Sequence, residues 1–245
     1  MKKKTNLNVP VLAGLFILAN SASAMLWTAG HGDLGVEYLG SGDLELEWHL
    51  GEDNETVVID NVPQTFGPGG QGFEAADLTA QTDLSGSRPA GSQWDFTGAA
   101  SGESIYAFPQ LENATVPFLG IGTEELNPAD WSTDLTYTLT GFSGPGDFSL
   151  YTVDGFGTLT EFISTDGGIT GSVAQAAGTH AHYNWTFTEI GTYDLTFDVS
   201  ATHDTDGLAT GAETFTFSVV PEPSAFASIA GLLVLAAVGL RRRRS

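Results

Sequence analysis

The chain has 245 residues, no cysteine and a formal net charge of −22 at pH 7. Such a charge excludes nucleic acids and anionic lipid surfaces as partners, because their phosphates would be repelled. The absence of cysteine excludes disulfides and thiol chemistry, so an apolar core must hold the fold together.

The first 24 residues have the three parts of a secretory signal. Three lysines form a basic start, residues 9–19 form an apolar run, and Ala22-Ser23-Ala24 is a small-residue cleavage site. The apolar run is too short to span a bilayer, so we expect signal peptidase to cleave after Ala24. The chain is therefore predicted to be exported.

Alternation of apolar and polar side chains marks the first strands. In residues 43–50 every second side chain is apolar, and His49 lies on the polar face. Residues 55–60 are the expected partner of this strand through a short turn. Residues 61–130 show weaker alternation, and we expect them to form a long glycine-rich connection. A boundary between two β subdomains is possible near residues 126–131.

The second half of the chain alternates more clearly. Further strands are predicted at residues 132–142, 147–153, 159–165 and 213–220. Residues 181–199 form the best expected hairpin, with Trp185 and Phe187 on its inward face. Strands with one apolar face and no helical periodicity favour an all-β fold, an antiparallel β-sandwich of the immunoglobulin-like or jelly-roll kind, over residues 25–220.

Two of the five histidines stand one position apart in this predicted hairpin. In a strand, His180 and His182 would project from the outward face with about 7 Å between their α-carbons. His203 follows the return strand and would lie beside them if the hairpin pairs as expected. Imidazoles at this spacing, completed by carboxylates, suit Zn²⁺. His31 and Asp33 repeat the same spacing near the N-terminus.

The acidity of the central region is compatible with several roles. Between residues 25 and 220, 29 acidic residues face a single basic one, Arg88, which gives a formal charge of −28. This field concentrates cations, so His49 beside its acidic neighbours is a further candidate metal ligand. Residues 203–207 resemble part of a calcium loop but lack the spaced ligands of an EF-hand, so calcium is a second possible ion.

A structural or adhesive protein of an exopolysaccharide matrix is the alternative to a metal-binding protein. A carbohydrate-binding module that uses Trp94 or Trp131 is a variant of this alternative. No nucleophile elbow, phosphate loop or cysteine nucleophile is present, so we expect no enzyme.

The C-terminal region combines a short motif, an apolar run and a basic tail. The run covers residues 225–240, about 24 Å as a helix at 1.5 Å per residue. The motif and tail residues are Pro221, Glu222, Pro223, Arg241, Arg242, Arg243 and Arg244. In this order they resemble a PEP-CTERM sorting signal. That resemblance implies a transmembrane helix before processing, an exosortase as partner, a Gram-negative envelope and delivery to the cell surface or extracellular matrix.

The segment "GTHAHYNWTFTEIGTYDLTF" resembles the signature of surface-anchored proteins with a choice-of-anchor M domain. The segments "LWTAGHGDLGVEY" and "GPGDFSLYTVDGFG" match other blocks of that family, so the likeness covers most of residues 26–220. The resemblance implies a zinc-linked surface protein, with a metal transporter as a possible partner. His31, Asp33, His180 and His182 fall on the motif positions, whereas His49 and His203 are candidates from strand geometry alone.

Overall fold

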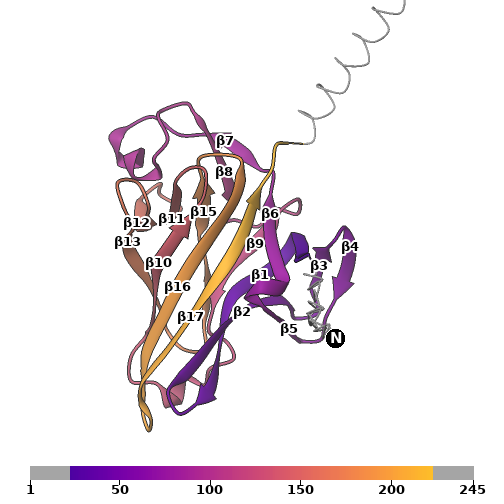
Figure 1. The fold of residues 1–245 in the computed structure, drawn as a ribbon, viewed down its shortest axis with the longest axis vertical. Helices are drawn as coiled ribbons and strands as arrows, with labels where there is room; N and C mark the ends of the chain where they lie inside the picture. The colour runs from indigo at the N-terminus through magenta and orange to yellow at the C-terminus, as the bar shows by residue number, and fades with distance from the viewer. Residues whose placement is uncertain (1–22, 223–245) are drawn as a thin grey trace, which may run out of the picture.

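The computed structural model describes residues 23–222 and shows an all-β fold (Figure 1). Ala24, the predicted cleavage position, immediately precedes the first strand. Most of the predicted signal, together with Pro223, the apolar run and the four arginines, lies outside the described residues. Over residues 23–222, the structure contains no helix with the length and apolar character needed to cross a membrane.

Seventeen strands and three short 3-10 helices make up the described part of the chain. The first nine strands are β1 (Met25–Gly40), β2 (Asp43–Glu52), β3 (Thr56–Ile59), β4 (Val62–Thr65), β5 (Gly69–Glu74), β6 (Leu78–Thr82), β7 (Ser85–Ser87), β8 (Ser104–Phe108) and β9 (Pro117–Gly122). The others are β10 (Leu135–Ser143), β11 (Phe148–Val153), β12 (Leu159–Ser164), β13 (Thr170–Gln175), β14 (His180–His182), β15 (Asn184–Phe187), β16 (Gly191–His203) and β17 (Gly207–Val219). The helices are η1 (Ala75–Asp77), η2 (Ser92–Thr97) and η3 (Pro128–Asp130).

One sheet contains β1–β6, β9, β10, β14, β16 and β17. Its longest antiparallel pairs are β1 with β2 and β16 with β17, and the second pair follows the long axis of the molecule in Figure 1. Parallel pairs also occur, since β1 lies beside β6 and β9, and β17 lies beside β6. The sequence predicted antiparallel pairing alone. A parallel pair needs a long crossover, and residues 41–116 provide one between β1 and β9.

A second sheet contains β7, β8, β11, β12 and β15, and β13 pairs with strands of both sheets. The inner faces of the two sheets pack through aromatic side chains. The Trp185 ring of β15 stacks on the Phe217 ring of β17 with 5.7 Å between centroids, and both side chains are fully buried. The predicted inward position of Trp185 is thus confirmed. One hydrophobic core extends from Trp27 to Val219, so both sides of residues 126–131 contribute to it.

Three predicted local arrangements are wrong. Strand β3 pairs with β1 and β4 and not with β2, and residues 61–130 contain six strands where a connection was expected. The predicted hairpin at residues 181–199 does not form, because β15 pairs with β8 and β11 while β16 pairs with β10 and β17. The Tyr193 hydroxyl binds the backbone of Glu189 and holds the chain in an arch from one sheet to the other.

Candidate metal centre

Four strands, β2, β1, β9 and β14, lie side by side in this order. Asp33 of β1 lies opposite His49 of β2 on one side and opposite Gly120 of β9 on the other. His182 and His180 of β14 lie opposite Gly120 and Gly122. Side chains that are directly opposite in a sheet project from the same face. The histidines of β14 and the polar residues of β1 therefore face each other across β9.

Glycine in β9 gives the opposing side chains the room to meet. A Cβ atom at Gly120 would clash with Asp33 Oδ1 and lie 3.1 Å from His182 Nδ1. One at Gly122 would lie 3.0 Å from the Asp33 Cβ atom. The two glycines thus replace the row of side chains that an ordinary strand would carry, and residues from β1 and β14 fill the space.

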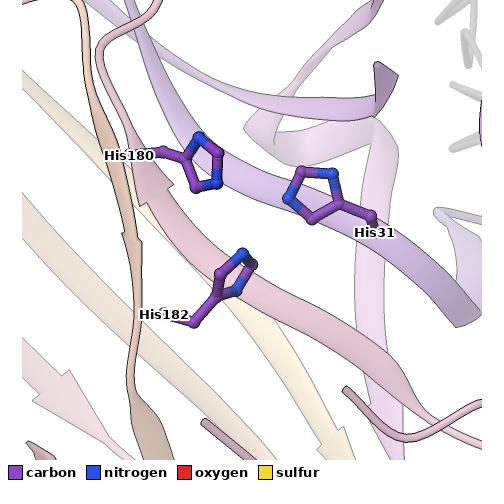
Figure 2. Close-up of side chains that lie close together, drawn as sticks. All are labelled: His31, His180 and His182. Atoms are coloured by element: carbon purple, nitrogen blue, oxygen red, sulfur yellow. The ribbon is translucent and has the colours of Figure 1, made fainter. Parts of the chain in front are cut away.

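The rings of His31, His180 and His182 lie close together (Figure 2). The ring centroid of His31 lies 5.5 Å from that of His180 and 5.1 Å from that of His182, and the two β14 rings are 5.4 Å apart. One nitrogen from each ring lies within 4.8 Å of the other two. An open pocket of about 250 Å³ over the three rings gives an ion access from solvent.

Other groups orient each of the three rings. His31 Nδ1 lies 3.3 Å from a carboxylate oxygen of Glu55, and His180 Nδ1 is hydrogen-bonded to Glu124. The His182 ring stacks on Phe118 at a centroid distance of 3.6 Å. A carboxylate on the outer ring nitrogen is the arrangement that fixes the tautomer of a metal-binding histidine and directs its other nitrogen at the ion.

Buried polar atoms without a hydrogen-bond partner concentrate in this cluster. Within residues 23–222, five buried side-chain atoms lack a partner, and three of them are His31 Nε2, Asp33 Oδ1 and His182 Nδ1. Asp33 itself is 2% exposed. Buried polar groups in folded proteins are almost always satisfied, so three such atoms at one place mark this cluster as a candidate binding site.

Burial determines the charge of the metal-free cluster. It raises the pKa of Asp33 to about 8, with His180 opposing and Glu124 adding to this shift. Burial, together with the neighbouring His31, lowers the pKa of His182 to about 4. The pKa of His31 is lowered by burial against the opposing charge of Glu55. At neutral pH both rings are therefore neutral and carry free lone pairs, as metal ligands must.

Adding a methyl group at residue 120 tests the packing of the centre. We expect Gly120→Ala to destabilise the protein by about 1–3 kcal/mol and to weaken metal binding, because its Cβ atom would overlap the Asp33 carboxylate. Thermal unfolding with and without metal measures both effects. Gly86→Ala is the matched control, since no atom lies within 4 Å of a Cβ at that strand position. Equal behaviour of the two variants would contradict the assigned packing.

The structure separates the six candidate ligands of the sequence. It brings together His31, His180 and His182 from two segments far apart in the sequence. Asp33 adjoins them, in a group with His180 and Glu124 and with its Oδ2 atom 3.6 Å from His31 Nε2. His49 lies nearby but belongs to another group, with Glu52 and Glu125.

His203 is not part of the cluster, and its predicted place beside the His180 pair is wrong, because that place depended on the missing hairpin. Its ring stacks on Tyr38 at 4.5 Å and packs against Trp131. The carboxylates of the predicted calcium segment serve as hydrogen-bond acceptors, Asp204 for Ser132 and Asp206 for Tyr38.

Sequence reasoning missed the carboxylates that surround the histidines. Glu124, Glu125, Glu52 and Glu55 come from the ends of β9 and β2 and from the turns beyond them. Nothing in the sequence distinguishes them among 29 acidic residues, apart from the glycines that precede Glu124.

Comparison of the chain with protein-family models, with characterised proteins and with solved structures found no match.

Proposed function

We propose that the protein binds one Zn²⁺ ion through His31, His180 and His182, with Asp33 as the fourth ligand. Three imidazole nitrogens and one carboxylate oxygen make a tetrahedral set of the kind that zinc prefers, whereas calcium and magnesium prefer oxygen ligands alone. Strand ends and turns provide the carboxylates that orient the rings, so the site needs no large rearrangement to receive the ion.

The convergence of three buried, unpartnered atoms carries this proposal. His31 Nδ1 faces Glu55, which assigns the ring proton to that nitrogen and leaves a lone pair on Nε2. The lone pairs of His182 Nδ1 and of Asp33 Oδ1 also lack a partner. With Asp33 ionised, the three atoms are all acceptors, and a single cation binds all of them whereas one water molecule has only two protons.

The terminal segments and the family resemblance support a proposal for the cellular location and role of this site. We propose a β-sandwich domain, exported and processed by an exosortase, that scavenges, stores or hands over zinc at a Gram-negative cell surface. Likeness to the choice-of-anchor M domain supports the link to zinc and to a metal transporter. The charge of −28 in residues 25–220 supports it too, since it raises the local concentration of cations.

Removal of two ring ligands tests the proposal. The variant His180→Ala with His182→Ala is expected to lower the zinc affinity of this site at least ~1000-fold, since four ligands together contribute ~10–16 kcal/mol to a zinc site. Calorimetric titration of the purified full-length protein in mild detergent measures the affinity. His203→Ala is the matched control and should leave it unchanged, because that ring packs against Tyr38 and Trp131 instead.

Dialysis against Zn²⁺ and Ca²⁺ followed by metal analysis separates this function from the matrix alternative. The proposal is supported if the wild-type protein retains zinc and the His180 and His182 double variant does not. Weak calcium uptake at many positions, unchanged in the His180 and His182 double variant, would instead support an acidic matrix protein.

A further inference from the structure

A second group of potential ligands lies on the outward face beside the zinc centre. It consists of His49 and Glu52 on β2 and Glu125 in the turn after β9, and one ligand atom from each lies within 4.8 Å of the others. The proposed zinc ligands do not include any of these three residues.

His49 is oriented as a metal-binding histidine is. Its side chain is 9% exposed, and its Nδ1 atom lies 3.0 Å from Glu47 Oε1. The Nε2 atom points to the other members of the group, 3.5 Å from Glu52 Oε1 and 3.3 Å from Glu125 Oε1. A carboxylate on the far nitrogen increases the basicity of the nitrogen that faces the ion.

In the metal-free protein a proton takes the place of the ion. His49 Nε2 donates it to the Gly69 carbonyl oxygen at 2.7 Å, with two carboxylate oxygens close by. A divalent cation bound by Nε2 would replace this proton and meet the same three oxygen atoms. Exchange of a ring proton for a metal ion is the usual coupling of metal binding to proton release.

Glycine surrounds this second group as it surrounds the first. A Cβ at Gly70 would lie 2.7 Å from His49 Nε2, and one at Gly35 would lie 2.9 Å from His49 Cβ. A Cβ at Gly72 would clash with the Glu47 carboxylate. Neighbouring strands thus lack a side chain where the His49–Glu47 pair lies, which leaves space for the pair.

The two groups adjoin one another. Asp33 of the zinc centre lies directly opposite His49 in the pairing of β1 with β2. Glu52 and Glu124 line the same pocket, and Glu124 in turn binds His180. Between residues 25 and 220 the single basic side chain is Arg88, and it pairs with Asp95. No lysine or arginine of this region therefore neutralises the carboxylates between the two groups.

We propose that His49, Glu52 and Glu125 form a second divalent cation site next to the zinc site. One imidazole and two carboxylates suit an ion of intermediate hardness such as Zn²⁺ or Mn²⁺. The second site extends the proposed zinc function and rests on it for the choice of ion. With both sites filled, the outward face of β2, β1, β9 and β14 holds a pair of ions in a continuous row of ligands.

The stoichiometry of zinc binding tests this proposal. Full-length protein in mild detergent, loaded with Zn²⁺ and freed of excess by gel filtration, is expected to retain two ions per chain. The variant Glu52→Gln with Glu125→Gln should retain one, as should His180→Ala with His182→Ala, and the quadruple variant should retain none. Glu37→Gln with Glu45→Gln removes two charges from exposed positions of β1 and β2 and should still retain two ions.

Each proposal has its own contradicting result. One ion in the wild type, lost with the histidine pair and unaffected by the Glu52 and Glu125 substitutions, would overturn the second site and leave the zinc proposal standing. One ion lost only with the glutamate pair would overturn the zinc proposal instead. Where the glutamate double variant does not fold, Glu125→Gln alone should weaken the second ion at least ~10-fold in calorimetry. Unchanged affinity in that variant would refute the second site.

Discussion

Saturating Zn²⁺ is expected to raise the melting temperature of the protein by several degrees or more. An ion present at 1000 times its dissociation constant stabilises the folded state by ~4 kcal/mol, which corresponds to ~8–16 °C for a domain of this size. The stabilisation arises because His31, Asp33, His180 and His182 meet only in the folded chain, where β9 lies between β1 and β14. Differential scanning calorimetry at pH 8 measures it.

This stabilisation should grow as the pH rises from 6 to 8. In the metal-free protein burial raises the pKa of Asp33 to about 8. Burial lowers the pKa of His180, but its bond to Glu124 and the charges of Asp33, Glu124 and Glu52 together outweigh burial, so the pKa of His180 is also raised. Zinc must displace these protons, so each pH unit below the pKa of Asp33 should weaken the apparent affinity ~10-fold. His182, with a pKa of about 4, is already neutral over this range and adds no pH dependence.

Two measurements decide whether the stabilisation comes from this centre. Calcium at the same concentration should produce little of it, because nitrogen ligands bind calcium poorly. The His180→Ala, His182→Ala variant should lose most of it, while His203→Ala should keep it. An equal shift in all three proteins would mean that zinc acts through the general negative charge of the surface.

Local periodicity predicted the strands and the outward position of the histidine pair. Alternation in residues 43–50 places Trp48 in the core, and the structure has that side chain fully buried. In residues 180–187 the same period places His182 on the outer face and Trp185 in the core. These predictions hold because they depend only on the two-residue repeat of a strand, whichever strand becomes its neighbour.

This periodicity does not predict which strands pair with each other, and the site depends on that pairing. Two strands with aromatic inward faces have the same sequence pattern whether they form a hairpin or are joined by an arch between two sheets. The hairpin interpretation therefore placed His203 beside His180, whereas β14 pairs with β9 and β16 pairs with β10 and β17. The same limit hid the approach of His31 to His180, which requires parallel pairing of β1 with β9.

The glycines of β9 carried a signal that the sequence reasoning did not use. Gly120 and Gly122 alternate with the buried residues Leu119 and Ile121, so glycine occupies every outward position at the end of this strand. Glycine weakens a strand, and a row of it marks a place where other groups approach closely. Such a row in a chain with a His-x-His pair is a pattern from which a site between strands can be inferred.

Asp33→Asn is expected to stabilise the metal-free protein and to weaken zinc binding. Asp33 is 2% exposed and its Oδ1 has no partner, so its ionised form is costly in the absence of a cation. Its pKa is about 8 when folded against about 3.8 in the unfolded chain, so Asp33 costs stability progressively as the pH rises from 4 to 8. Asparagine does not ionise. The variant should gain at least ~2 kcal/mol at pH 8.5, or ~4–8 °C in melting temperature, and less at pH 4.5.

Saturating zinc should reverse the order of stability of the wild type and the Asp33→Asn variant. The carboxylate of the wild type binds the ion with its charge, whereas the neutral amide of the Asp33→Asn variant offers only a weak oxygen donor. Saturating zinc should therefore stabilise the wild type above the variant at pH 8.5. Asp43→Asn, which removes a charge from an exposed position of β2, controls for the loss of surface charge and should show neither effect. A metal-free Asp33→Asn protein that is less stable than the wild type at pH 8.5 would mean that the buried carboxylate is satisfied without a cation, and the zinc centre would lose its fourth ligand.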